Sequence, residues 1–317
     1  MRPELSVVIL SCNQFAGTTG PCLESLRRVA EPELEIIVVD NCSDAQTRSS
    51  LQQAAGLDSR VRLLLNEKNR GYAGGNNDGV ALARGDLIVL LNSDTRVLPR
   101  SLVLLAEGVR SSSAPLLLGP VTNSAGNEQQ VFVRPGSAEE ILRQGEVWSS
   151  HARGSSFATD QLSFFCVAMA KKTYDELGGL DEGFGLGFYE DTDFCCRAAR
   201  QGFSLGVLEE SFVYHQGSAC FATMPARTRK LLKINRRRFR EKNGRVATTH
   251  VRAKNLAVLY RYLVESIQGG TGDSRRYRFE NRLHQAAVLR PNNPLKRLLY
   301  RWRLQRVRQA AKRAGLC

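Results

Sequence analysis

The sequence predicts an α/β protein built on a mostly parallel sheet with helices on both faces. One pattern occurs four times in the first 120 residues: an apolar, β-rich run, then a polar or glycine-containing turn, then a segment with helical spacing. Runs that are apolar on both faces and alternate with helices are typical of a buried parallel sheet. Polar residues follow three of the four runs, at the strand ends where such sheets bind ligands.

The expected elements follow from this pattern in chain order. The first strands are Leu5–Leu10, Leu34–Asp40, Val61–Leu65 and Leu87–Leu91, and the helices between them are Thr19–Val29, Ala45–Ala55 and Gly74–Ala83. Residues 121–160 are rich in Asn, Gly, Ser and Gln, so we expect a substrate-facing loop region with one helix, Ala138–Gln144. A strand at Leu162–Ala170, a helix at Tyr189–Gln201 and two short strands, Ser204–Leu208 and Phe212–Tyr214, complete this part.

The charge is distributed so unevenly that we expect two regions. Residues 222–317 contain 26 Lys and Arg but only four Asp and Glu, whereas residues 1–221 carry a net charge of −8. We therefore predict an α/β domain over residues 1–225 and a basic helical extension over residues 226–317. The extension either packs on the domain with its charged face in solvent or binds anionic lipid. No nucleic-acid binding is expected, because no known DNA- or RNA-binding motif accompanies the charge.

An apolar stripe near the end of the chain supports the lipid alternative. Leu295, Leu298, Leu299 and Trp302 have the spacing of one face of a helix, with Arg and Lys around them. No run approaches the roughly 20 apolar residues of a spanning helix, and no signal peptide is apparent. The eight cysteines form no CxxC pair and have no zinc-finger spacing, so we expect small, buried thiols in a reducing compartment. The sequence thus predicts a cytoplasmic protein, peripheral at most to the inner face of the plasma membrane.

Two runs contain candidate metal ligands. LNSDT (residues 91–95) places Asp94 directly after a buried strand, with Asn92 and Ser93 beside it. Oxygen ligands on a tight turn suit Mg²⁺ or Mn²⁺, which can hold a nucleotide diphosphate, although Asp94 could equally be a turn or helix-cap residue. YHQGS (residues 214–218) places His215 at a strand end, where it is either a further metal ligand or a structural histidine.

The run GFGLGFYEDTDFCCR (residues 183–197) contains three acids at an expected helix start: Glu190, Asp191 and Asp193. Acids in the first turn can simply offset the helix dipole. The glycines before them, however, let a ligand approach the backbone closely. Asp191 is the candidate general base, because a carboxylate that faces a sugar hydroxyl can take its proton.

A second glycine-rich run, NRGYAGGNNDG (residues 69–79), is neither GxGxxG nor a Walker A loop. Its amides and Arg70 could hold a diphosphate or a sugar, or the glycines could serve only close packing. Asp40, after the second strand, either binds a base or ribose or caps the next helix.

These motifs, in this order, resemble family-2 glycosyltransferases with the GT-A fold. The resemblance covers about residues 4–244, from SVVILSCN through VVDNCSD, NRGYAGGNN, GDLIVLLNSDT, GGLDEGFGLGFYEDTDFCCRA and YHQGSA to INRRRFREKNG. It looks closest to the rhamnosyltransferase-like, O-antigen-type branch, to which GPVTNSAGNEQ (residues 119–129) is also similar. It implies a metal-dependent, inverting hexosyltransferase with a Rossmann-like sheet, acting in the synthesis of bacterial surface polysaccharide.

The resemblance also implies roles for the matching residues. Asn92 stands where the family often has Asp, which leaves one acid fewer for the metal. The implied sets are a nucleoside and donor set (Ser11, Asn13, Asp40, Asn69, Arg70, Gly71, Asn76, Asn92 and Ser93), a Mn²⁺ or Mg²⁺ pair (Asp94 and His215), a base with its acceptor-side neighbour (Asp191 and Glu190), and a sugar- or acceptor-recognition pair (Asn127 and Glu128).

The implied partners are a dTDP-, UDP- or GDP-sugar donor and a glycan or lipid-linked acceptor. Two alternatives differ in class. A sugar-phosphate nucleotidyltransferase would use a similar sheet, but residues 11–20 lack a basic residue for a triphosphate loop. A non-catalytic sugar- or polyanion-binding module on this fold would not need Asp94, Asp191 and His215 together.

Overall fold

The computed structural model describes residues 3–29, 34–217, 225–244, 246, 249–269 and 272–316. In these residues one sheet has the strand order β3-β2-β1-β4-β8-β6-β9-β5, and β7 pairs with β9. The strands are β1 (Leu5–Ser11), β2 (Leu34–Asp40), β3 (Val61–Leu65), β4 (Leu87–Asn92), β5 (Thr95–Val97), β6 (Leu116–Val121), β7 (Ser156–Ala158), β8 (Cys166–Ala170) and β9 (Ser204–His215).

The predicted parallel sheet is confirmed for its first four strands, since β3, β2, β1 and β4 pair in parallel. Alternate side chains of these strands enter two cores. Val7 and Ile9 pack with α1 (Thr19–Arg27), α2 (Ala45–Gly56) and α4 (Ser101–Arg110). Val8 packs on the opposite face, with α3 (Gly71–Leu82), α6 (Lys171–Glu176) and α7 (Glu190–Arg200).

Beyond β4 the sheet is mixed, because β8 is antiparallel to both β4 and β6. The prediction of two short strands near the end of the domain was wrong, since residues 204–215 form the single strand β9. The polar residues that suggest a break are instead buried in the strand. Glu209 and Ser211 are fully buried, and Ser211 Oγ donates to the carbonyl of Ser101 at 2.9 Å.

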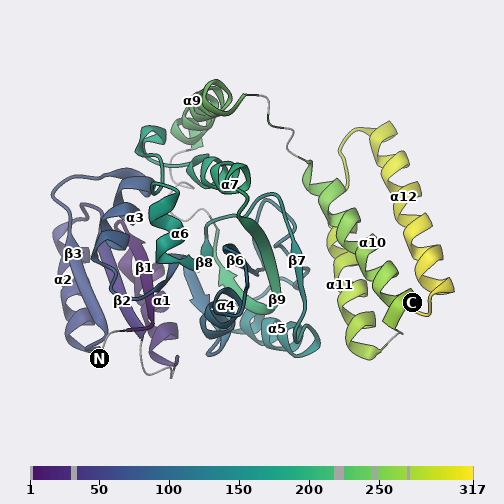
Figure 1. The fold of residues 1–317 in the computed structure, drawn as a ribbon, viewed down its shortest axis with the longest axis horizontal. Helices are drawn as coiled ribbons and strands as arrows, with labels where there is room; N and C mark the ends of the chain where they lie inside the picture. The colour runs from purple at the N-terminus through teal and green to yellow at the C-terminus, as the bar shows by residue number, and fades with distance from the viewer. Residues whose placement is uncertain are drawn as a thin grey trace.

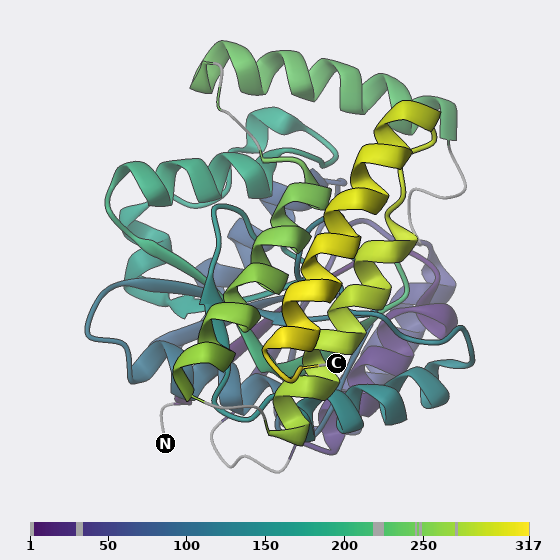
Figure 2. The same ribbon diagram turned by 90° about the vertical axis from the view of Figure 1, so that its right-hand side faces the viewer.

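Helices continue to the end of the chain (Figure 1), as α9 (Pro225–Asn243), α10 (Val251–Gly269), α11 (Asp273–Val288) and α12 (Pro294–Arg313). α9 lies above α7, whereas α10, α11 and α12 run side by side at one end of the sheet (Figure 2). α11 packs on α5 (Ala138–His151), which continues seven residues past the predicted helix end.

Buried charges join the C-terminal helices to the sheet. The carboxylate of Glu209 on β9 lies 2.9 Å from Arg282, 3.2 Å from Arg278 and 3.3 Å from Arg261. Both Glu209 and Arg282 are fully buried. The predicted division at residue 225 stays a prediction, and it does not correspond to a gap in packing.

The apolar stripe of α12 faces outward. Leu295 is 74% exposed and Trp302 is 52% exposed, while Tyr300, Leu304 and Val307 on the opposite face are buried against α10 and α11. In the part of the chain that the structure describes, no helix is long and apolar enough to cross a bilayer.

The cysteine prediction holds in part. Cys22, Cys166 and Cys195 are buried free thiols, but Cys42 is an exposed free thiol because it lies in the turn after β2. Cys12 and Cys196 are half-buried free thiols, and Cys220 and Cys317 lie outside the described residues.

Candidate active site

The polar residues predicted at strand ends meet at one edge of the sheet. In the parallel register, Ser11 at the end of β1 is opposite Asp40 at the end of β2, and Leu10 is opposite Asn92 at the end of β4. The carboxyl ends of parallel strands form the usual ligand-binding edge. The turns after these strands therefore build the walls of the site.

Hydrogen bonds join the turns after β1 and β2. The backbone N–H of Asn13 donates to Ser43 Oγ at 2.8 Å. The side-chain oxygen Oδ1 of Asn13 accepts from the backbone N–H of Asp44 at 2.9 Å. Asn13 has a φ of 56° and is exposed to solvent at this edge of the sheet. Nucleoside contact by Asn13 stays a prediction.

Ser11 and Asp40 point into the wall. Ser11 Oγ lies 2.8 Å from Thr19 Oγ1, and the fully buried carboxylate of Asp40 accepts from Arg48 Nε at 2.9 Å and from the amide of Ser43 at 3.2 Å. The alternative role of Asp40 as a helix cap was wrong, because Asp44 caps α2 by accepting from the amide of Thr47. Nucleoside contact by Ser11 and Asp40 stays a prediction that needs these side chains to change partners.

The glycine-rich run at residues 69–79 packs against the second glycine-rich run. Gly71 has a φ of +70°, and a Cβ there would lie 2.0 Å from the carbonyl oxygen of Gly185. Asn69 Oδ1 accepts from the backbone N–H of Gly71 at 2.9 Å. Gly71 is the first residue of α3, which begins three residues earlier than predicted. The packing alternative therefore accounts for Gly71 without a phosphate.

The side chains of this run are also engaged within the protein. Arg70 pairs with Asp78 at 2.8 Å and with Glu182 at 3.1 Å. Asn76 is buried and donates to the carbonyl of Tyr72 at 2.8 Å. Diphosphate contact by Asn69, Arg70 and Gly71, and donor contact by Asn76, stay predictions.

Asp94 and His215 lie side by side, as the metal prediction requires. Asp94 Oδ1 is 3.4 Å from His215 Nε2, and His215 Nδ1 is 2.9 Å from the carbonyl oxygen of Ser124. The ring of Phe165 stacks on the imidazole at 5.1 Å. Burial lowers the pKa of His215, but Asp94 and the Ser124 carbonyl together hold that pKa above its ordinary value.

This donor set fits a divalent cation. The Ser124 carbonyl fixes the proton on Nδ1, so Nε2 can act as a ligand beside the Asp94 carboxylate. Within the described residues, no group of three or more acids, cysteines and histidines is arranged so that it could hold a metal ion. A bound Mn²⁺ or Mg²⁺ would therefore take further ligands from water and from the diphosphate of a donor. Asn92 is the last residue of β4, and the buried Ser93 precedes Asp94 in the turn that follows.

Glu190 and Asp191 form an acid pair at the start of α7, in which Glu190 is buried and Asp191 is partly exposed. Burial and the charge of Asp191 raise the pKa of Glu190 to about 8. Burial also raises the pKa of Asp191, against hydrogen bonds from Thr192, whose amide lies 2.6 Å from Asp191 Oδ1. A pKa of about 8 favours the protonated form of Glu190 near neutral pH.

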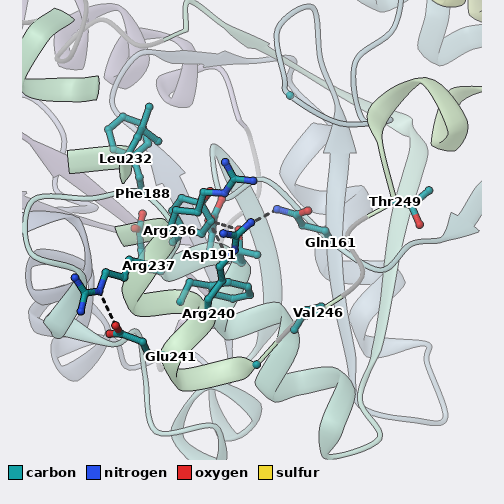
Figure 3. A pocket seen from close by; sticks show the side chains of 16 residues that line it. Gln161, Phe188, Asp191, Leu232, Arg236, Arg237, Arg240, Glu241, Val246 and Thr249 are labelled. Carbon is teal, nitrogen blue, oxygen red and sulfur yellow. Dashed lines mark hydrogen bonds and ion pairs between the residues drawn. The ribbon is translucent and has the colours of Figure 1, made fainter. Parts of the chain in front are cut away.

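A cavity of about 1400 Å³ opens beside this pair. Gln161 lies on one side of Asp191, and the α9 side chains Leu232, Arg236 and Arg240 lie on the other (Figure 3). Gln161 Nε2 donates to Thr192 Oγ1 at 2.9 Å, so the wall is tied to the acid pair. The cavity is large enough for a sugar and part of what it is attached to.

Tyr72 links the metal pair to the acid pair. Its hydroxyl donates to the carbonyl of Phe164 at 2.6 Å, and burial followed by the negative charges of Glu190, Asp191 and Asp94 raises its pKa. The next residue, Phe165, stacks on His215. Asp94 and the acid pair therefore both act on Tyr72, and a single site that joins positions 94, 191 and 215 stays a prediction.

Asn127 and Glu128, the predicted recognition pair, are buried and point away from open space. Asn127 Nδ2 donates to the carbonyl of Gln161 at 3.2 Å, and Glu128 accepts from Thr159 Oγ1 and lies 3.6 Å from Lys254. The exposed residue of this loop at the cavity is Gly126. A recognition role for Asn127 and Glu128 stays a prediction.

Several residues of the site were not identified from the sequence. No sequence pattern around Tyr72 or Gln161 indicates a role in a site. Tyr72 bonds to Phe164, 92 positions away, and Gln161 bonds to Thr192, 31 positions away. Ser124 contributes only its carbonyl, and a carbonyl contribution is not visible in a side-chain pattern.

The sequence of this chain is similar to those of known proteins. Residues 6–158 match the family model described as Glycosyl transferase family 2. The succinoglycan biosynthesis protein ExoO of Rhizobium meliloti is 34% identical over 114 residues, which are 36% of this chain and 32% of that protein. The O-antigen biosynthesis protein RfbC of Myxococcus xanthus is 26% identical over 231 residues, 71% of this chain and 17% of that protein. The chain thus spans a third or less of the length of these two relatives.

A solved structure supports the fold. The mannosyltransferase PcManGT from Pyrobaculum calidifontis, in complex with GDP-Man and Mn²⁺, is similar over 100% of this chain and 88% of that chain, with a TM-score of 0.51 and 16% identity. The predicted GT-A fold with C-terminal helices is confirmed.

Proposed function

We propose that this chain, a member of glycosyl transferase family 2, transfers a sugar from a nucleotide-sugar donor to an acceptor hydroxyl with inversion at the anomeric carbon. The observation that carries this proposal is the pair of adjacent acids, Glu190 and Asp191, that lines a cavity of about 1400 Å³, and the Asp94–His215 pair, 3.4 Å apart, supports it. Relatives in succinoglycan and O-antigen biosynthesis favour a role in surface polysaccharide synthesis.

The acid pair supplies the base of the reaction. Asp191 takes the proton of the acceptor hydroxyl as its oxygen attacks the anomeric carbon, and the bond from that carbon to the diphosphate breaks. Glu190 stays protonated, which leaves the negative charge on Asp191 and provides a donor for a substrate oxygen. Nucleotide diphosphate leaves from the opposite face, so a single displacement inverts the centre.

A divalent cation is part of the proposal. When bound, such an ion neutralises the charge that grows on the leaving diphosphate. Asp94 and His215 would hold it, and the mannosyltransferase that is similar in fold contains Mn²⁺ with GDP-Man. We propose a hexosyl donor, with rhamnose one candidate sugar, and a glycan or lipid-linked acceptor in the cavity beside Asp191.

The test is nucleotide release from a panel of UDP-, GDP- and dTDP-sugars with Mn²⁺ and with EDTA. We expect one donor to release nucleotide diphosphate, EDTA to abolish the release, and Asp94→Asn to lower it strongly. Asp175→Asn, which removes a carboxylate from the surface of α6 (56% exposed), is the matched control and should behave as wild type. Diphosphate formed from a nucleoside triphosphate and a sugar phosphate would instead support the nucleotidyltransferase alternative. Donor binding with no turnover would support the non-catalytic module.

We further propose that α12 contacts an anionic membrane surface. Leu298 and Trp302 are 64% and 52% exposed, and basic residues flank them in the sequence. The protein should float with phosphatidylglycerol vesicles but not with pure phosphatidylcholine vesicles, and the double variant Leu298→Ser/Trp302→Ser should lose this binding. Ile267→Ser, at a 77% exposed position on α10, is the control. Equal flotation of all variants would reject the proposal.

A further inference from the structure

One buried side chain of α9 holds the turn that precedes the acid pair. Asn235 is 2% exposed. Its Nδ2 lies 2.8 Å from the carbonyl oxygen of Phe184, 2.7 Å from that of Gly187 and 3.0 Å from that of Phe188, and it donates to these acceptors. One side-chain amide, 47 to 51 positions further along the chain, therefore shares its two N–H groups among three carbonyls of one turn.

The turn needs such support because its backbone is strained. Phe188 has a φ of 73° and Tyr189 a φ of 77°, both in the left-handed region that side chains disfavour. Each costs about 1–2 kcal/mol relative to an ordinary conformation. Strained residues of this kind persist only where the surroundings hold them. Tyr189 is the N-cap of α7, so its conformation sets the direction in which Glu190 and Asp191 leave the turn.

Other side chains of α9 also contact the turn or the body of α7. Arg238 lies 5.6 Å over the ring of Phe184, but in the described residues these contacts do not involve the carbonyls of the turn. The ring of Phe239, four residues after Asn235, packs on Tyr189 at 5.5 Å. Further along, Asn243 Nδ2 donates to Asp193 Oδ1 at 2.9 Å, and Lys242 lies 2.9 Å from Asp193 Oδ2. Asn243 is also buried, so it anchors the same helix without touching the carbonyls of residues 184–188.

We propose that Asn235 is a positioning residue: by holding the Phe188–Tyr189 turn, it aims the carboxylate of Asp191 at the acceptor hydroxyl. This role rests on the proposed glycosyl transfer. It makes α9, which the sequence placed in a basic extension, a structural part of the active site.

Two alanine variants separate positioning from simple anchoring. Asn235→Ala and Asn243→Ala remove the same buried amide from the same helix, and Asn235→Asp keeps the volume of residue 235 but loses its donor. We expect both residue-235 variants to lower kcat for nucleotide release by about 10- to 100-fold, since small misplacements of a catalytic group have effects of this size. The KM for the donor should stay near its wild-type value. Asn243→Ala should lower the thermal midpoint but leave kcat within about twofold.

The pH profile gives a readout that anchoring alone would not change. A relaxed turn exposes the acid pair to water, so the acidic limb of the kcat profile should move to lower pH in Asn235→Ala but not in Asn243→Ala. Equal losses of kcat in the two alanine variants, or an unmoved limb in Asn235→Ala, would overturn the proposal.

Hydrogen exchange makes the test independent of activity. Peptides that cover residues 184–192 should exchange faster in Asn235→Ala than in Asn243→Ala and wild type. If wild type turns over no donor, the proposed function fails, while exchange still decides whether Asn235 holds the turn. Unchanged exchange in that segment would reject the role of Asn235 even in an active enzyme.

Discussion

Replacing Glu209 with Gln tests whether the C-terminal helices and the sheet fold as one unit. Glu209 lies on β9, the strand that ends at His215, and its carboxylate faces three arginines of α10 and α11. Tyr262 also donates its hydroxyl to Glu209 Oε1. Glutamine keeps the shape of the side chain but removes the only negative charge that these contacts share.

The expected loss follows from burial. Arg282 is fully buried, so the variant leaves its guanidinium without this counter-charge. Removing one partner of a buried pair costs about 3–5 kcal/mol. Arg282 also donates to the carbonyls of Glu128 and Gln130, and these bonds remain, so we expect the lower end, about 3 kcal/mol. The control Glu265→Gln removes a half-exposed carboxylate from Arg261 and should cost at most about 0.5 kcal/mol.

Urea unfolding followed by tryptophan fluorescence measures the difference. Trp148 is 1% exposed and donates its indole N–H to the carbonyl of Glu209 at 2.7 Å, so its emission reports on this contact. Burial raises the pKa of Glu209, but Arg282, Tyr262 and the other arginines outweigh it and hold that pKa below its ordinary value. The stabilisation by the Glu209 carboxylate is therefore present above about pH 4.3 and is lost as the pH falls through the pKa of Glu209 in the folded protein. Below that pH, the unfolding midpoints of wild type and Glu209→Gln should converge. A Glu209→Gln midpoint no lower than that of Glu265→Gln would refute this reasoning.

Three further predictions concern the site. Asp191→Asn should lower turnover by about 10²–10⁴ while donor binding by thermal shift stays unchanged; near-normal turnover would remove Asp191 as the base. Gly71→Ala should destabilise the fold by more than about 2 kcal/mol in urea, because of the positive φ and the contact with Gly185. Gly17→Ala, where a Cβ meets nothing within 4 Å, is its control, and equal midpoints would contradict the packing argument. Burial and the charge of Asp191 raise the pKa of Glu190 to about 8. The contribution of Glu190 to the free energy of unfolding is therefore fully present below about pH 4.5 and is lost as the pH rises through about 8. Glu190→Gln should therefore gain stability relative to wild type between about pH 5 and 9, and a constant difference across that range would show that Glu190 is not buried as described.

Much of the catalytic end could be predicted from the sequence. Strands β1 to β4 match their predicted ranges to within one residue, because each is a mostly apolar run. β1, β2 and β4 are buried on both faces, and the edge strand β3 is partly exposed. Asp94, Asp191 and His215 could be proposed as site residues because ionisable side chains directly after strands and glycine-rich turns are visible in the sequence. Strand β9 was divided in two because Glu209 and Ser211 are polar, and only their partners in distant segments explain their burial.

The sequence alone determined the order of the motifs and the sheet edge to which they belong, since hydrophobic periodicity and turn residues are local properties. Tertiary structure decided which of these polar residues face open space. Asp40, Arg70 and Glu128 are bound by partners 8 to 126 positions away along the chain. The tertiary structure also decided that Asn235 contacts the turn before Asp191 and that the apolar stripe of α12 faces outward. These outcomes depend on how helices pack against one another. The partner that a side chain meets in this packing cannot be read from the hydrophobic periodicity of the residues next to it in the sequence.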